Sequence, residues 1–186
     1  NNLAELIAYG KANKGKLSYA TAGAGSSMHL AGEQLNILTG IDMLHIPYKG
    51  AGGAYGDVFD GRVDLLIDPV FSSMPHVKSG RLKPIAIMGM TRDTSLPQVQ
   101  AAGEMFADFD FASNLGIALP RATPADIIAK INADVNRAIR SEALAPRLRD
   151  MGLTVTGSTP EEFDAHMRRS LKVFADIVRT AHVKAE

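Results

Sequence analysis

The residue types most suited to binding chemistry gather in a short stretch, residues 21–27, which contains Gly23, Gly25, Ser26 and Ser27. Glycine lets the backbone adopt positive φ and approach a ligand without a Cβ in the way. Either serine is a suitable N-cap for the helix that the following apolar spacing predicts. Because a helix start leaves its first N–H groups unpaired and carries partial positive charge, this stretch predicts a seat for a carboxylate or a phosphate.

The same stretch has a simpler interpretation as a tight turn between a strand and a helix. Glycine-rich turns of this kind are common in α/β domains, and the local pattern alone does not separate a connection from a binding site. A P-loop is not indicated, because no Lys-Ser or Lys-Thr pair follows the glycines. The dinucleotide-binding fingerprint also fits poorly, because Met28 stands where its third glycine is required.

The composition narrows the functional classes. The 186 residues are 46% hydrophobic and 22% charged, which is typical of a chain that folds around a core. Acidic and basic residues balance at 20 each, which argues against a nucleic-acid surface and a polybasic membrane patch. Cysteine is absent, which excludes disulfides and thiolate chemistry and is consistent with an oxidising compartment. No apolar run is long enough to span a bilayer, and we expect any targeting segment to lie outside this sequence.

The first half of the chain alternates short apolar segments with helical patterns. Glycine-rich turns separate the two kinds of segment. The predicted strands are residues 17–20, 42–47, 63–67 and 82–90, and the predicted helices lie around residues 3–13, 26–39, 54–59 and 70–77. This repeated order predicts the α/β class, with a largely parallel sheet and helices on both of its faces.

The pattern changes in the second half. Residues 111–119 predict one more strand, and the remainder is mostly helical apart from a lone predicted strand at 153–156. Residues 159–162 combine a capping box with proline at the first helical position, so a long final helix should begin there. Because one strand cannot cover these helices, we expect a second lobe whose other strands lie in an N-terminal part absent from this sequence. The alternative is a single domain in which the helices fold back over the first sheet.

Several motifs occur together in a recognisable order. Residues 15–19 (GKLSY), 25–33 (GSSMHLAGE) and 45–50 (HIPYKG) resemble the extracytoplasmic solute receptors of tripartite tricarboxylate transporters, also called Bordetella uptake gene receptors. The resemblance continues in order through residues 61–65, 79–86, 96–97, 132–136 and 159–163. Each motif alone is weak, but their joint order and spacing cover almost the whole chain.

The resemblance implies a clamshell of the periplasmic-binding-protein type II kind, which binds a small carboxylate between two lobes. Residues 1–118 then form a complete ligand-binding lobe two, and residues 119–186 the C-terminal helical part of lobe one, whose N-terminal half is absent. The hinge would include residues 111–119. A periplasmic receptor of this kind delivers a dicarboxylate, tricarboxylate, amino acid or aromatic acid to membrane permease subunits. It needs no catalytic residue, cofactor or metal, binds no nucleic acid and is not embedded in the membrane.

The resemblance also implies which residues hold the ligand. In this family a carboxylate sits among loops at strand ends, near helix N-termini and often with bridging water. The matching positions are Thr21, Ala22, Gly23, Ser26 and Ser27 in the first turn, Tyr48, Lys49 and Gly50 in the second, and Asp68 after the third strand. Their backbone N–H and hydroxyl groups would orient the anion without a buried arginine. Asp68 could accept a hydrogen bond from a ligand amine or hydroxyl, or hold loops of lobe two in place.

Some positions have a structural interpretation or depart from the family pattern. Lys49 can be a solvated side chain, and Asp68 can be a turn residue only. We expect His29 to pack or cap rather than to act on a ligand, and His45 to be structural. The family usually has asparagine where Pro69 stands, and an aromatic residue near the hinge where this chain has residues 113–116. Both departures bear on the identity of the ligand more than on the fold.

Two other functional classes remain open from the residues. An enzyme could use the glycine turns for a phosphorylated or carboxylated substrate, although no nucleophile–base pair is evident in the sequence. A sensor lobe could bind an effector and signal through a partner. Turnover of a bound ligand would favour the enzyme, and a DNA-binding or membrane-signalling segment would favour the sensor.

Overall fold

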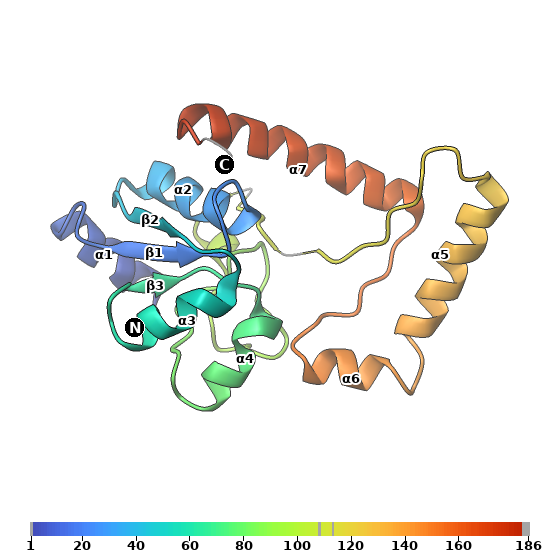
Figure 1. Cartoon of the computed structure of the whole chain (residues 1–186), viewed down its shortest axis with the longest axis horizontal. Coiled ribbons are helices and arrows are strands. Elements are labelled where there is room, and N and C mark those ends of the chain that lie inside the picture. The colour runs from blue at the N-terminus through green and yellow to red at the C-terminus, as the bar shows by residue number, and fades with distance from the viewer. Residues whose placement is uncertain (1, 108, 113, 184–186) are drawn as a thin grey trace. The chain divides into compact units, whose positions relative to one another are not determined.

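The computed structural model describes residues 2–107, 109–112 and 114–183, which form two compact units. The first unit comprises the described residues before 113 together with those from Phe174 onward, and the second unit is Asn114–Val173. Figure 1 shows the elements of both units along the chain.

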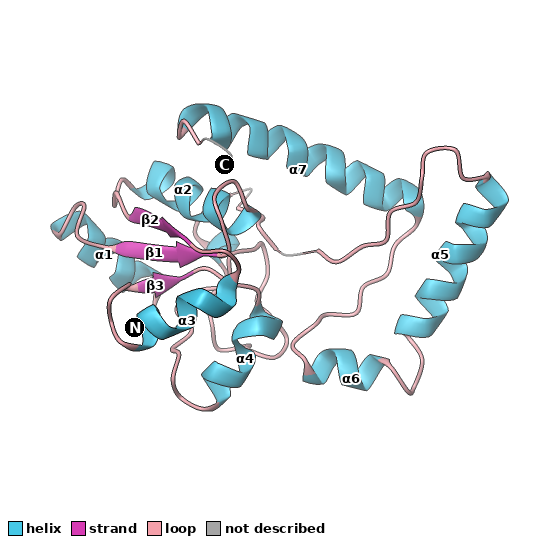
Figure 2. Ribbon diagram, in the orientation of Figure 1, coloured by secondary structure: helices cyan, strands magenta, loops and turns pink. Residues whose placement is uncertain are grey.

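The first unit is built on a small parallel sheet. Its strands are β1 (Ser18–Thr21), β2 (Leu44–Pro47) and β3 (Leu65–Leu66), in the order β2-β1-β3. Both neighbours run parallel to β1, and Tyr19 is paired with His45 on one side and with Leu65 on the other. The strands are the magenta arrows of Figure 2, and all three point the same way. The predicted α/β class with a parallel sheet is therefore confirmed.

Helices precede, connect and follow the three parallel strands. They are α1 (Leu3–Ala12), α2 (Ser27–Thr39), α3 (Ala51–Phe59) and α4 (Val70–Lys78), and a short 3-10 helix spans Ala102–Glu104. Since β1, β2 and β3 precede α2, α3 and α4 in turn, the starts of these helices lie at the carboxyl edge of the sheet. The candidate site is placed at this edge because parallel pairing brings three helix N-termini there.

The core lies on both faces of the central strand. Side chains alternate along a strand, so Tyr19 and Ala20 point to opposite faces, and both are buried. The ring of Tyr19 packs against α2 at Gly32, where a Cβ would overlap the ring. Ala20 packs on the other side with Ala54 and Val63.

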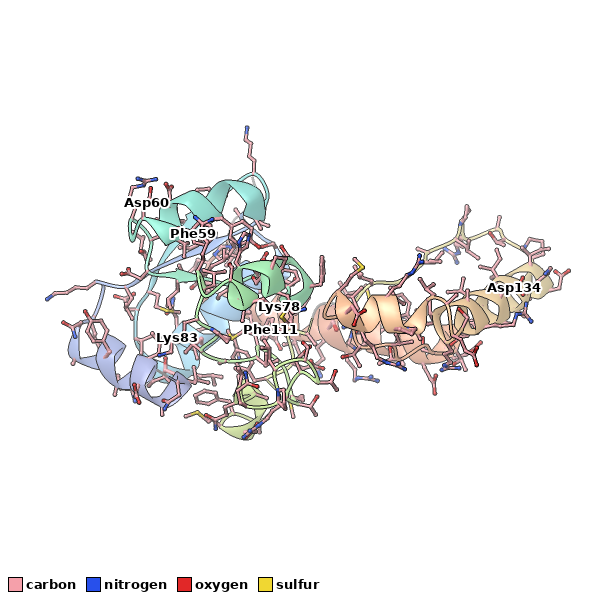
Figure 3. The ribbon with its side chains drawn as sticks, turned by 90° about the horizontal axis from the view of Figure 1, so that it is seen from below. Phe59, Asp60, Lys78, Lys83, Phe111 and Asp134 are labelled. Carbon is pink, nitrogen blue, oxygen red and sulfur yellow. The ribbon has the colours of Figure 1, made fainter. Side chains whose placement is uncertain are left out.

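Aromatic side chains join α3 to α4. The rings of Tyr55 and Phe59 lie 4.3 and 5.1 Å from the ring of His76. The Arg81 guanidinium lies 3.7 Å from the centre of the Phe59 ring, a cation–π contact. Figure 3 labels Phe59 at the end of α3 beside Asp60. These contacts hold α3 and α4 together.

Three predicted strands are wrong within the described residues. Residues 82–90 form only an isolated parallel bridge, Ile87 with Ala101, because a proline at position 84 lacks the N–H that a ladder needs. Of residues 111–119, residue 113 lies outside the described part, and the others pair with no strand. Residues 153–156 likewise meet no partner strand among the described residues, and the Arg140 side chain donates to the Thr156 carbonyl instead.

The second unit contains α5 (Ala125–Ile139), α6 (Ala145–Asp150) and most of α7 (Pro160–Thr180). The predicted capping box is present: the Thr159 amide donates to Glu162 Oε2 at 2.9 Å, and the Glu162 amide to Thr159 Oγ1 at 3.1 Å. The apolar stripes are largely uncovered. No side chain of α5 is buried, and Leu171 of α7 is 63% exposed. The last part of α7 belongs to the first unit, where Phe174 stacks on Phe111 at 5.6 Å.

Candidate ligand-binding site

The structure brings the two predicted glycine turns into direct contact at the carboxyl edge of the sheet. The Tyr48 amide donates to the Thr21 carbonyl, and the Gly50 amide to the Ala22 carbonyl, both at 3.1 Å. Gly23 has φ of +153°, and a Cβ there would lie 3.6 Å from the Tyr48 carbonyl oxygen. The turns therefore form one continuous backbone surface.

The hydroxyl groups of Thr21 and Ser26 shape the first turn from within. Thr21 is fully buried, and its Oγ1 lies 3.2 Å from the Gly23 carbonyl oxygen and 3.3 Å from the Gly23 nitrogen. Ser26 Oγ donates to the same carbonyl at 2.8 Å and accepts from the His29 amide at 3.2 Å as the N-cap of α2. Neither hydroxyl is free to be the main donor to a ligand.

Backbone amides supply the donors that the turn leaves available. Within the described part of the chain, the amides of Ala22, Ser27 and Met28 have no acceptor, and all three residues are half-buried. Among the described residues, the Ser27 hydroxyl bonds only to Met28 Sδ, a weak acceptor, at 3.6 Å. Since Ser27 and Met28 are the first two residues of α2, the positive end of that helix adds to their attraction for an anion. Met28 is not among the site residues predicted from the sequence, although the second amide of a helix is always left without an intrahelical partner.

The second turn contributes backbone groups and one exposed cation, Lys49. Tyr48 Oη donates to Asp57 Oδ2 at 2.5 Å, and Asp57 is also paired with Arg62 at 2.6 Å. The hydrogen bond to Asp57 raises the pKa of Tyr48, and the same bond, with Arg62, lowers the pKa of Asp57. The phenol is thus bound to α3. Lys49 is exposed, and no described residue forms an ion pair with it.

Gly50 has φ of +91° and caps α3 without a side chain. Its amide is already bonded to Ala22, so Gly50 fixes the join between the turns rather than offering a donor. The positive φ favours glycine at this position, because a side chain there would be strained.

Asp68 is engaged by its neighbours. Its Oδ2 accepts hydrogen bonds from Tyr55 Oη at 2.7 Å and from Ser73 Oγ at 2.8 Å, and Tyr55 Oη also lies 2.9 Å from Ser72 Oγ. Burial is the main cause of the raised pKa of Tyr55. The bonds of Asp68 connect the end of β3 to α3 and α4, which is the loop-holding role, and both of them are made by Oδ2.

A buried polar cluster lies next to the first turn, and the sequence did not predict that its members meet. His29 is 8% exposed, and its Nδ1 accepts a hydrogen bond from the Gly25 amide at 3.0 Å. The His29 and His45 rings stack with centres 3.7 Å apart, and His45 Nε2 lies 2.7 Å from Thr21 Oγ1. Burial lowers the pKa of His29, and burial with the charge of His29 lowers that of His45 to about 4. The pairing of His45 with Tyr19 across the sheet is the register that brings the two rings together, and no local motif reports it.

Other kinds of site find little support in the described residues. No three histidine, aspartate or glutamate side chains among them converge as metal ligands. No helix among them is long and apolar enough to cross a membrane. The second unit has a shallow cavity of about 400 Å³ between the starts of α5 and α7, lined by residues that include Ile128, Asn132 and Thr159, and it contains none of the predicted site residues.

Comparison with known proteins identifies relatives over nearly the whole chain. The family model described as "Tripartite tricarboxylate transporter family receptor" matches residues 1–180. The "UPF0065 protein in tcbD-tcbE intergenic region" of Pseudomonas sp. (strain P51) is 32% identical over 162 residues, covering 86% of this chain and 48% of the relative. BugT of Bordetella pertussis is 30% identical over 185 residues, covering 99% of this chain and 57% of BugT. The chain thus spans about half the length of these curated relatives.

Solved structures have the same fold. The structure of an R. palustris protein with adipate matches with a TM-score of 0.85 and 26% identity, over 100% of this chain and 62% of that one. MatC from Rhodopseudomonas palustris with bound malate matches with a TM-score of 0.72 and 28% identity, over 96% and 62% of the two chains. The family match over residues 1–180 agrees with the parallel α/β unit and with the turns joined at its carboxyl edge. The chain belongs to the tripartite tricarboxylate transporter receptor family, a family of extracytoplasmic solute-binding proteins.

Proposed function

We propose that this protein is a periplasmic solute-binding receptor that captures a small carboxylate and delivers it to membrane permease subunits of a tripartite tricarboxylate transporter. The observation that carries the proposal is the set of unpaired amides at Ala22, Ser27 and Met28 on joined turns. The relatives named with adipate and malate support a carboxylate as the ligand class.

The proposed site uses the predicted residues in two ways. Ala22 and Ser27 donate to the carboxylate, and Lys49 adds a positive charge at the rim. The other predicted residues keep the donors in place: Thr21, Gly23 and Ser26 shape the first turn, Tyr48 and Gly50 the second, and Asp68 the third. Preformed amides bind an anion with little reorganisation, because the fold has already fixed them.

We assign residues 1–118 to lobe two and residues 119–186 to the helical part of lobe one. The uncovered apolar stripes of α5 and α7 support this assignment, because an amphipathic helix of a folded protein packs its apolar face on a partner. The stripes are then the surface that the rest of lobe one covers.

The proposal is capture without chemical turnover. Thr21 Oγ1 lies 2.7 Å from His45 Nε2, which is the distance of a nucleophile from its base. Thr21 is fully buried, however, so a substrate has no access to that hydroxyl. The hydroxyl is also shared with both backbone groups of Gly23, which suits a structural role.

A thermal-shift screen of the full-length protein tests the proposal. Dicarboxylates including malate and adipate, amino acids and aromatic acids are each compared with their uncharged amides. A ligand present at 100 times its dissociation constant raises the unfolding free energy by about 2.7 kcal/mol, which is a readily measured shift. The proposal predicts stabilisation by at least one acid and none by its amide. A flat screen, or release of a chemically changed ligand, would contradict it.

A further inference from the structure

His29 connects the first glycine turn to the helix that follows it. The Gly25 amide donates to His29 Nδ1 at 3.0 Å. Because a backbone amide can only donate, Nδ1 carries no proton here, and the proton of the neutral ring lies on Nε2. Nε2 lies 3.7 Å from Glu33 Oε1 on the next turn of α2. The hydrogen bond that holds the turn therefore exists only while Nδ1 of the His29 ring is unprotonated.

The groups around His29 hold the ring in this orientation. His45 of β2 stacks on it with an angle of 13° between the planes. Tyr19 of β1 donates to Glu33 Oε1 at 2.6 Å and to the His29 carbonyl oxygen at 3.3 Å. These three residues, from β1, β2 and α2, are the titratable groups that face His29 among the described residues. Glu33 is the only anion among them, and Tyr19 already occupies the oxygen that faces the ring.

We propose that neutral His29 is a positioning residue for the carboxylate-binding turn, and that protonation of its Nδ1 releases the turn and weakens binding. A protonated Nδ1 would place its N–H against the N–H of Gly25, two donors with no acceptor between them. Rotation of the ring to avoid this is opposed by the stack on His45. This inference rests on the proposed function and makes it dependent on pH. The ligand favours the conformation of the turn that neutral His29 holds, whereas a proton on Nδ1 favours the released conformation.

The competition between ligand and proton is expected outside the neutral pH range. Burial lowers the pKa of His29, so the ring stays neutral at pH 7.5. The effect is therefore expected below pH 6.5, about the ordinary pKa of histidine. The affinity of the wild-type protein should be highest at neutral pH and should fall as the solution is acidified.

A pH series of binding on the full-length protein tests the inference. The dissociation constants of malate and adipate are measured from pH 7.5 to pH 4.5 for the wild type, for His29→Asn and for His166→Asn. Asparagine can place Oδ1 where Nδ1 stands, so it accepts from Gly25 but does not titrate. His166 lies on α7 and bonds to Asn114, so it serves as the matched histidine control. Titration of the ligand's own carboxyl groups is common to all three proteins.

The inference predicts that the dissociation constant changes more steeply with pH for the wild type than for His29→Asn. Below the pKa of His29, the dissociation constant of the wild type should rise about tenfold per pH unit more than that of His29→Asn, as expected for one linked proton. His166→Asn should follow the wild type. Equal slopes for the wild type and His29→Asn would overturn the inference and leave the proposed function intact. Failure of the wild type to bind any carboxylate at pH 7.5 would overturn the proposed function, and the inference with it.

A second readout needs neither ligand nor variant. In an NMR titration of the ligand-free protein, the ring nitrogens of His29 and the amide of Gly25 should change with a common midpoint. A Gly25 amide that does not respond while His29 titrates would overturn the inference, even if His29→Asn failed to fold.

Discussion

Replacing Ser27 with proline removes one proposed donor and little else. Ser27 is the first residue of α2, where proline has a suitable φ and where its missing N–H costs no intrahelical bond. Proline also requires an extended residue before it, and Ser26 has φ of −67° and ψ of 159°. The Ser27 amide has no acceptor among the described residues, so the fold should tolerate Ser27→Pro.

The expected loss of affinity follows from the bond removed. A hydrogen bond to a charged group contributes about 1.5–3 kcal/mol, so Ser27→Pro should raise the dissociation constant about 10- to 150-fold. Ser27→Ala keeps the amide and removes only the hydroxyl, so its loss should stay below about tenfold. The difference between the two variants isolates the backbone donor from the side chain.

Isothermal titration of the full-length protein measures the effect. The ligand is the acid that stabilises the protein most in the thermal-shift screen, which includes malate and adipate. Ala125→Pro is the matched control, because it places proline at the first residue of α5 after an extended Pro124. We expect it to bind as the wild type does. If Ser27→Pro folds and binds as tightly as Ser27→Ala, the Ser27 amide does not hold the ligand and the reasoning is refuted.

Three further predictions concern stability and are measured by urea unfolding. Gly32→Ala should lower the unfolding free energy by about 1–3 kcal/mol because its Cβ overlaps the Tyr19 ring. The control Gly56→Ala, whose Cβ meets nothing within 4 Å, should raise it by about 0.5–1 kcal/mol. Equal effects of the two substitutions would contradict the packing described. Asp68→Ala should cost about 1–3 kcal/mol because it leaves hydroxyl groups without their acceptor, and a variant as stable as the wild type would refute the loop-holding role. The pKa of His45 is lowered to about 4, so the unfolded chain binds its proton first, and stability that is complete above pH 6.5 should fall as the pH drops toward 4. The full shift corresponds to about 3 kcal/mol, which the ring's partial exposure reduces to about 1–2 kcal/mol, and His45→Gln should flatten the profile.

The elements that were predicted correctly depend on residues close together in the sequence. Ser26 caps α2, Gly40 ends it with φ of 69°, and the box at Thr159 and Glu162 starts α7. Each is a contact within one or two turns, so the pattern of a few residues is sufficient to predict it.

The wrong predictions concern pairing, which is not local. The apolar segments 82–90 and 153–156 have strand composition, but a strand also needs a neighbour that offers hydrogen bonds. The neighbour of Ile87 is a single residue, Ala101, and Thr156 meets a side chain instead. Sequence composition records the preference of a segment and not the availability of its partner.

The sequence predicted two glycine-rich turns at strand ends but not the contacts that each of their residues makes. The turns meet because β1 and β2 are adjacent. The alternating pattern predicted a parallel sheet but not which strands are neighbours. Which donors stay unpaired depends on bonds such as Tyr48 to Asp57 and Asp68 to Tyr55. These are fixed by helix packing, so the sequence alone could not separate the residues that shape the turns from those that face a ligand.

The measurement that tests the central claim most directly is a crystal structure of the full-length protein with the acid that stabilises it. The account predicts a carboxylate oxygen at about 2.7–3.2 Å from the amide nitrogens of Ser27 and Met28, at the start of α2. A carboxylate bound elsewhere, or held by charged side chains while these amides contact only solvent, would contradict it.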